Sequence, residues 1–396
     1  MKKRLRVGTI ATVLVLLASS LLYILFTLPA FSDSMRETID SDSLYRQGLV
    51  SEAWSEECPT AVSDAPVQAN IEETGSCLMV GVIIQGYGLH SAMAPYGTTL
   101  DDVKPGTSVV MVNYDNGETN DWFMAGVDKS FPVIISVLLC VLIIFMVTRT
   151  KGLKAIAGIA ISLAALMFYV IPAILSGHPS TMVTLATAIL ILGLVMYLTH
   201  GISWMTTAAF LGTTAGLFII LGLTLVFDTV ARGYTSLPDE LIEFIRFLPQ
   251  DPDLISSLSH LYFASIILVG VGILNDVMIA QASTVWTLQR TATEKLTPYK
   301  LFTEAMKVGR DHISSAMYTL TFVYAATALP LMLTSYVYMN LSWLALFSSE
   351  FGMEILRTGL CITGLMIATP ATTYLASWMT TFIPEKSLQV EHGHKH

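Results

Sequence analysis

Long apolar runs separated by short polar segments make up most of this chain. A helix needs roughly 17–25 mainly apolar residues to cross the hydrocarbon core of a bilayer. Runs of about this length lie near residues 7–30, 131–148, 155–175, 181–199, 203–227, 261–282, 314–337 and 356–381. The pattern therefore predicts a membrane all-α bundle of about eight transmembrane helices. Pro370 interrupts the last run, which a membrane helix tolerates where neighbouring groups satisfy the freed carbonyl.

Residues 31–130 form the only long polar segment, between the first run and the other seven. Up to about residue 77 this segment is acidic and has no clear periodicity. From about residue 78 it is rich in Val, Ile, Met and Phe, interrupted by Gly and by Asp-Asn-Gly, which is typical of strands and turns. The strands are expected at 78–84, 108–114 and 122–127. We therefore predict a small β-rich extracytoplasmic domain.

The remaining segments complete the predicted domain organisation. Residues 1–30 are expected to be an N-terminal transmembrane anchor; the alternative is a cleaved signal peptide, whose apolar part normally has about 7–15 residues. Residues 131–385 are expected to form a seven-helix bundle. Within it, residues 237–248 have helical spacing of apolar and charged positions, which predicts an amphipathic helix on the outer surface. A short helix is expected to start near Pro298 in the charged inner loop.

The composition supports a membrane protein. The chain is 53% hydrophobic and 13% charged, whereas an average soluble chain is about one-quarter charged. The lipid bilayer is therefore the expected partner, and nucleic acid is not. We find no His-Glu-x-x-His sequence and no Walker loop, so we expect neither an enzyme nor a cofactor or bound metal.

The distribution of Lys and Arg predicts the orientation. With the N-terminus inside, 14 basic residues fall on the cytoplasmic side and seven, including Arg357, on the outside. Both termini are then cytoplasmic. The C-terminal tail, residues 386–396, carries His392, His394 and His396, which could bind a metal or belong to a disordered polar end.

The outer segment has two further chemical features. It carries 16 Asp and Glu against four Lys and Arg, which either attracts cations or is simply a solvated acidic face. Cys58 and Cys77 lie within it, whereas Cys140 and Cys361 lie in apolar runs. In an oxidising compartment the outer pair is expected to form a disulfide; two free thiols are the alternative.

Asp276 is the most informative ionisable residue. It lies about 15 residues into the run that begins at 261, so about 22 Å from the outer end of that helix. Charged groups at membrane depth are costly, and this makes them candidates for function. Gly272, Asp276, Ala280 and Ser283 form one narrow, small and polar stripe, with Asn275 beside it. Such a stripe is expected to face a neighbouring helix. Alternatively, Asp276 is solvated at the inner interface or paired with Arg310.

The expected neighbour is the helix that follows the charged loop and begins with Arg310, Asp311 and His312. Arg310 is the natural counter-charge for a carboxylate on either helix. His312 and His200 lie near inner helix ends, where a histidine either passes protons or is an ordinary interfacial residue. Asp276, Asn275, Arg310, Asp311, His312 and His200 are therefore the candidate residues for proton or ion coupling.

Three stretches have a distinctive sequence: Thr199–Gly201 (THG), Gly270–Ser283 (GVGILNDVMIAQAS) and Lys307–Leu331 (KVGRDHISSAMYTLTFVYAATALPL). Together they resemble a known family, the YibE/F-like membrane proteins of bacteria. The pattern extends over most of residues 78–380. The resemblance implies a bacterial cytoplasmic membrane, an outer β-rich domain and a multi-helix bundle, but no established activity. Where a pair of aspartates is expected, this chain has Asn275 and Asp276.

A weaker resemblance concerns the hairpin formed by the sixth and seventh predicted helices. A Gly-rich helix with Asn275 and Asp276, a charged loop and a Thr-rich helix are similar to the central hairpin of resistance-nodulation-division transporters and SecD/SecF proteins. That resemblance implies a proton relay through a carboxylate and a neighbouring basic residue.

Two hypotheses of function remain at this point. One is an ion- or proton-coupled transporter or exporter of an unknown small molecule or ion, with Asp276 as the proton-linked group. The other is a non-transporting envelope scaffold or accessory protein that binds a partner, or a second copy, through its outer domain.

We also expect Gly212 and Gly216 to form a small-xxx-small helix contact.

Overall fold

The computed structural model describes residues 2–40, 45–57, 76–95, 97–115, 120–230, 256–258, 260–292, 294–338 and 350–382. The contacts divide the chain into two compact units: residues 35–149, and residues 1–34 together with 150–396. Each unit has a hydrophobic core of its own. The predicted helix at 237–248 and the histidines of the tail lie outside the described residues.

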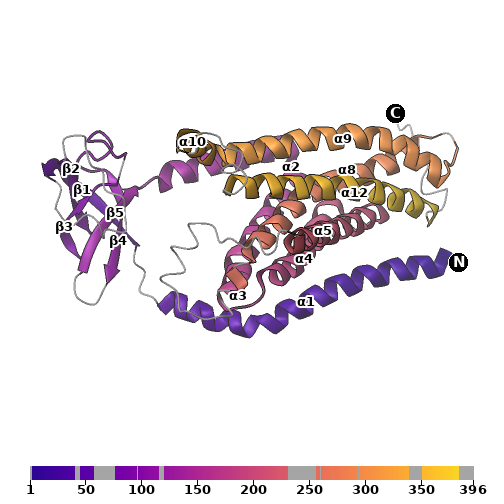
Figure 1. The fold of residues 1–396 in the computed structure, drawn as a ribbon, viewed down its shortest axis with the longest axis horizontal. Coiled ribbons are helices and arrows are strands. Elements are labelled where there is room, and N and C mark those ends of the chain that lie inside the picture. The colour runs from indigo at the N-terminus through magenta and orange to yellow at the C-terminus, as the bar shows by residue number, and fades with distance from the viewer. Residues whose placement is uncertain are drawn as a thin grey trace, which may run out of the picture. The chain divides into compact units, whose positions relative to one another are not determined.

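The first unit contains a five-stranded antiparallel sheet that curves into a half-barrel (Figure 1). Its strands are β1 (Tyr45–Glu57), β2 (Ser76–Ile84), β3 (Gly88–Met93), β4 (Ser108–Asp115) and β5 (Asn120–Val127), in the spatial order β3-β2-β1-β4-β5. The three strands predicted from sequence are confirmed as β2, β4 and β5. The sheet also contains β3 and a long strand, β1, in a segment without clear periodicity.

Alternation of side chains gives the sheet its core. Val80, Val82 and Ile84 on β2 are almost completely buried, as are Met111 on β4 and Met124 on β5. Successive side chains of a strand point to opposite faces, so these positions fill one side of the sheet. The register of β1 against β2 shifts at residues 50–52, where the strand has an irregularity of the kind that bends strands.

The sheet continues directly into a membrane-length helix. Two residues separate β5 from α2 (Ser130–Ala165), which breaks at Arg149, where φ is 53° and ψ −131°. This break separates the two apolar runs predicted at 131–148 and 155–175. Asp128 lies at the junction and accepts hydrogen bonds from the Ser130 backbone N–H (2.8 Å) and from Gln47 Nε2 (2.6 Å). The start of the helix is thereby tied to β1.

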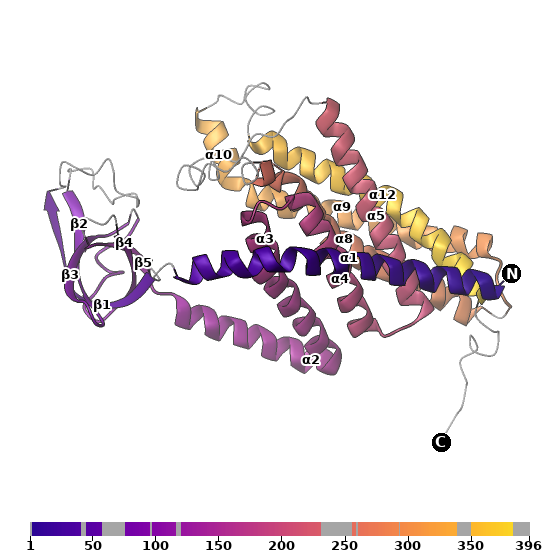
Figure 2. The ribbon, with the colours of Figure 1, turned by 90° about the horizontal axis from the view of Figure 1, so that it is seen from below.

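The second unit is a helical bundle (Figures 1 and 2). Its elements are most of α1 (Lys2–Asp40), the end of α2, a π-helical turn (Leu166–Val170), α3 (Ile171–Leu175), α4 (Ser180–His200), α5 (Trp204–Val230), α8 (Leu261–Thr291), α9 (Pro298–Thr327), α10 (Leu329–Tyr338), α12 (Glu350–Met379) and a 3₁₀ turn (Thr380–Phe382). Helix α8 packs against α4, α5, α9 and α12, so it is the centre of the bundle.

Within the described residues, seven segments are long and apolar enough to cross a membrane. This is consistent with a multi-pass membrane protein. The predicted run 314–337 is not one of the seven, because it is divided between α9 and α10 at Ala328. The short helix predicted from Pro298 is the first part of α9, and its charged residues lower the mean hydropathy of that helix.

Helices α5 and α12 approach closely at small residues. A Cβ atom added to Gly212 would lie 2.0 Å from Oγ1 of Thr372, and one added to Gly216 would lie 2.9 Å from Cβ of Ala368. From the other side, a Cβ on Gly364 would lie 2.2 Å from Cγ1 of Ile220. The predicted contact of Gly212 and Gly216 is confirmed. It is a small-xxx-small interface, in which close backbone approach replaces the hydrophobic effect that lipid does not supply.

Gly212→Ala is expected to lower the free energy of unfolding by about 1–3 kcal/mol, because the added methyl group overlaps Thr372 and the two helices must separate. The measurement is the thermal unfolding midpoint of the full chain in detergent. The matched control is Gly222→Ala on the same helix, where the added Cβ meets nothing within 4 Å. Equal midpoints for the two variants would contradict the interpretation of this contact.

The junction predicts a pH dependence. Hydrogen bonds from Ser130, and then from Gln47 and Ser108, lower the pKa of Asp128 to about 2. An unfolded Asp titrates near about 3.9, so the ionised carboxylate stabilises the fold above about pH 4, and this contribution disappears as the pH falls towards 2. Asp128→Asn should therefore lower the urea midpoint of the sheet, followed by tryptophan fluorescence, at pH 5–7 but not at pH 2.

The control for this experiment is Asp101→Asn, whose carboxylate is exposed and paired only with Lys104 on the surface. It should leave the midpoint unchanged at every pH. A deficit of Asp128→Asn that persists undiminished at pH 2 would show that the charge is not the cause.

Candidate functional site

Asp276 lies midway along α8, on the face of that helix that points away from the bundle. Asp276, Gly272 and Ser283 are exposed, and Ala280 is half-buried. In the described part of the chain the stripe is thus uncovered, whereas the sequence predicted it against a neighbouring helix. The reason is that the opposite face carries larger side chains, such as Leu274 and Met278, which fill the core. The proton-linked role of Asp276 stays a prediction.

The other candidate residues lie apart from one another. Asn275 is half-buried on α8; Arg310 and Asp311 are exposed and His312 half-buried on α9; His200 is the last residue of α4. Among the described residues, no hydrogen bond or ion pair joins any two of Asp276, Asn275, Arg310, Asp311 and His312. The hairpin of α8 and α9 instead closes through Gln281, whose Nε2 donates to the Ala305 carbonyl at 3.0 Å, beside Gly309.

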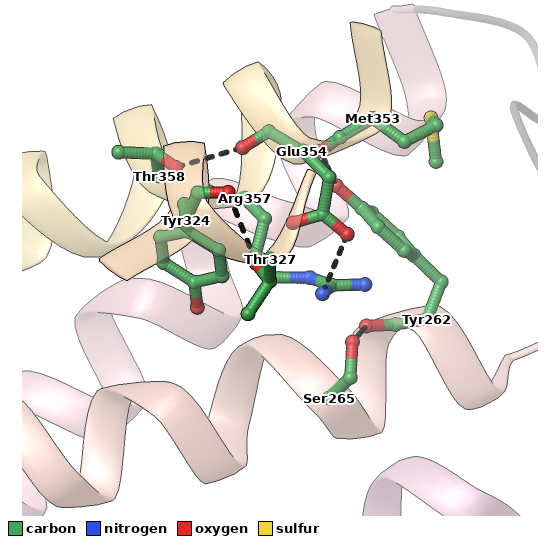
Figure 3. Close-up of polar contacts among 8 residues, drawn as sticks. All are labelled: Tyr262, Ser265, Tyr324, Thr327, Met353, Glu354, Arg357 and Thr358. Carbon is green, nitrogen blue, oxygen red and sulfur yellow. Dashed lines mark hydrogen bonds and ion pairs between the residues drawn. The ribbon is translucent and has the colours of Figure 1, made fainter. Parts of the chain in front are cut away.

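A charged cluster lies at the opposite end of this hairpin, near the start of α12. An oxygen of Glu354 is 2.9 Å from Nη1 of Arg357, and the two side chains are only 23% and 21% exposed. The guanidinium carbon of Arg357 lies 5.0 Å from the ring centre of Tyr262 on α8 and 6.0 Å from that of Tyr324 on α9. Figure 3 shows the arginine side chain between the two tyrosines. The cluster therefore joins three helices.

Further hydrogen bonds hold this end of the bundle together. The Tyr262 hydroxyl donates to the Met353 carbonyl, and Cys361 Sγ donates to the Ile266 carbonyl at 3.7 Å. Two buried polar atoms of the cluster, Nε of Arg357 and the Tyr324 hydroxyl, have no hydrogen-bond partner within the described part of the chain. Buried polar groups without a partner are rare and costly, so these atoms mark an unusual site.

The cluster lies near one end of the last membrane-length segment. Arg357 is about 9 Å along α12 from Phe351, where the membrane-length segment Phe351–Phe382 begins. The sequence interpretation missed this site because it began the last apolar run at residue 356. Glu354 then fell outside the run, and Arg357, at its very end, was counted with the basic residues of the outer loops. Two opposite charges three residues apart inside a segment of membrane length are the signal that identifies it.

A row of hydroxyl groups follows on the buried side of α12. Its members are Thr369, Thr372, Thr373 and Ser377 on α12 and Thr380 in the 3₁₀ turn that follows, all at most 1% exposed. Thr372 lies where three helices meet, against Gly212 of α5, and its hydroxyl donates to Sδ of Met278 on α8 at 2.8 Å. Most of these hydroxyls also bond to a carbonyl of their own helix, whereas Oγ of Ser377 has no partner in the described residues.

Two other sequence predictions concern disulfide and metal sites. Cys77 on β2 is disulfide-bonded, and Cys58, the predicted partner, lies outside the described residues. Cys140 and Cys361 are free thiols. The described residues contain no group of three His, Cys, Asp or Glu side chains placed to hold a metal ion.

The Glu354–Arg357 pair should be energetically coupled. Glu354→Gln and Arg357→Gln each leave a half-buried charge without its partner, at an expected cost of about 1–3 kcal/mol in unfolding free energy. The double variant should cost less than the sum of the two. Glu304 and Lys307 on α9 form the matched control, because they have the same spacing but are 41% and 65% exposed. Their coupling should be below about 0.5 kcal/mol; equal coupling in the two pairs would contradict the prediction.

Comparison with known proteins identifies the family of the bundle. The model of the family described as YibE/F-like protein matches residues 136–382, which include the charged cluster and the hydroxyl row. The match begins after the sheet. No curated protein and no solved structure matches the chain. Since the family model covers more than half of the sequence, the chain belongs to the YibE/F-like family.

Proposed function

We propose that this protein is an ion- or proton-coupled transporter of the bacterial cytoplasmic membrane, with both termini in the cytoplasm. The observation that supports the proposal is the hydroxyl row of α12. Thr369, Thr372 and Thr373 are completely buried in the bundle, and Thr369 lies within about 5 Å of the middle of the segment 351–382, counted along the helix axis.

Polar residues inside a membrane bundle usually mark the path of a solute or ion. A protein that only anchored an outer domain would gain from apolar side chains at these positions, because they pack without an unpartnered hydroxyl such as that of Ser377. The charged cluster near residues 354–357 lies towards one end of the same buried face of α12. Asp276, on the outward face of α8, is the second ionisable group at membrane depth and the proposed proton-linked residue.

A second candidate function, an envelope scaffold, is favoured by a different observation. Leu49, Ile83 and Leu89 lie directly opposite one another across β1, β2 and β3 and are 54%, 52% and 62% exposed. A contiguous row of exposed apolar side chains is a common feature of protein interaction surfaces. The experiment below separates the two functions, because only a transporter needs water inside the bundle.

The test is the reactivity of single cysteines towards a charged, water-soluble methanethiosulfonate reagent. Thr369→Cys and Thr372→Cys are made in a background in which Cys140 and Cys361 are replaced by Ser. If solutes cross the bundle along the row, both should react at least about tenfold faster than a cysteine that faces lipid, since the reacting thiolate forms only in water.

The matched control is Ile367→Cys, which lies at the same depth on the same helix but is 45% exposed on the surface of the bundle. If Thr369→Cys and Thr372→Cys are as unreactive as Ile367→Cys in intact membranes, the transport proposal is wrong and the scaffold becomes the better explanation.

A further inference from the structure

We infer that Arg357 is the binding site for a small oxyanion, a carboxylate or a phosphate, and that Glu354 takes up one proton when the anion binds. This inference rests on the proposed transport function, since it names the substrate class of the same bundle and a second proton-binding residue besides Asp276. It is carried by the hydrogen-bonding groups of the charged cluster and by its net charge.

The unpartnered groups of the cluster can donate hydrogen bonds, so they favour a ligand that accepts them. An oxygen of Glu354 lies 2.9 Å from Nη1 of the guanidinium, whereas Nε of Arg357 is buried without a partner in the described residues. The Tyr324 hydroxyl is also buried without a partner there, on a side chain that is 8% exposed. Both groups are donors, and the planar guanidinium matches carboxylate or phosphate oxygens in a bidentate manner. An oxyanion would accept from both.

Two aromatic rings hold Arg357 in position to bind the oxyanion. The rings of Tyr262 and Tyr324 lie 5.0 and 6.0 Å from its guanidinium carbon, and both are almost fully buried (Figure 3). A cation over the face of an aromatic ring is attracted by the negative charge of that face, so both rings stabilise the guanidinium in this position. The hydrogen bond from Tyr262 to the Met353 carbonyl fixes one of these rings to α12. The arginine is thereby preorganised.

The charge balance links the anion to a proton. In this structure the carboxylate of Glu354 neutralises Arg357. An added anion would leave one net negative charge in a site of low dielectric constant, which is costly unless the carboxylate is neutralised. One proton from solution, transferred to Glu354, restores neutrality as the anion takes its place beside Arg357. No bond other than this O–H bond is formed.

Among the side chains that the structure describes, those that contact Arg357 from the neighbouring helices carry no charge. They are Tyr262 from α8 and Tyr324 from α9; Cys361 follows one turn later on α12, and all three are neutral at physiological pH. On α10, the described titratable side chain Tyr336 is exposed. Glu354 is therefore the group in contact with Arg357 that can take up the proton.

The experiment uses the purified full chain in detergent with sodium phosphate or sodium acetate as probes, against sodium chloride at equal ionic strength. Either oxyanion should raise the thermal unfolding midpoint. About one proton should be taken up per bound acetate at pH 7 in weak buffer; acetate is used for this measurement because phosphate itself titrates near pH 7. Glu354→Gln should bind the anion at least as tightly without proton uptake. Arg357→Lys should weaken binding about tenfold, because the bidentate fork is lost.

Tyr324→Phe is the mildest variant, because it removes only a hydroxyl without a partner. It should fold at least as well as the wild type and weaken the binding of the anion about three- to thirtyfold. The control is Lys307→Gln, an exposed cation whose removal should change nothing. A second series, in nanodiscs with or without anionic phosphatidylglycerol, distinguishes a lipid phosphate from a free anion, since a lipid ligand would stabilise the protein only there.

The inference is overturned if neither the free anions nor the anionic lipid stabilises the wild type. It is also overturned if stabilisation is undiminished in Arg357→Lys, or if anion binding takes up no proton. If Thr369→Cys is reactive but no anion binds, the transport proposal stands with a different substrate. If anions bind with proton uptake but the row is unreactive, Arg357 is a binding site and transport along α12 is excluded.

Discussion

The close approach of α5 and α12 is the contact on which the rest of the bundle depends. Gly212 and Gly216 on one helix, and Gly364 and Ala368 on the other, have no room for larger side chains. In lipid, helices associate through packing rather than through the hydrophobic effect, so this fit positions α12 against α5 and α8. It also sets which face of α12 is buried, and that face carries both the hydroxyl row and the charged cluster.

The sequence predicted the elements that have a clear period and a characteristic length. It was least informative about which face of a helix points into the bundle. Seven of the eight apolar runs and three of the strands were found because each depends on a local pattern. The stripe at Gly272 and Asp276 was assigned to the interior because it is small and polar, yet the larger apolar face of α8 competes for the same core and buries more area. Orientation within a bundle is a property of several helices together.

The charged cluster shows a related limit. Neither Glu354 nor Arg357 is unusual at the end of an apolar run, where charges normally meet water. Their significance comes from Tyr262, 95 residues before Arg357, and from Tyr324 on another helix, which enclose the guanidinium in the folded chain. By contrast, the helix contact at Gly212 and Gly216 could be predicted, because two small residues spaced by four on one helix already indicate a close approach of another helix.

The junction at Asp128 connects the sheet directly to a membrane-length helix. Only two residues connect β5 to α2, and the carboxylate of one of them binds Gln47 of β1 and the first turn of the helix at once. The sheet and the segment Ser130–Arg149 therefore have no flexible linker between them and lie in one unit that ends at the break at Arg149. A change in the tilt of this helical segment would therefore rotate the sheet with it. A ligand bound to the sheet would in turn exert a torque on the helical segment.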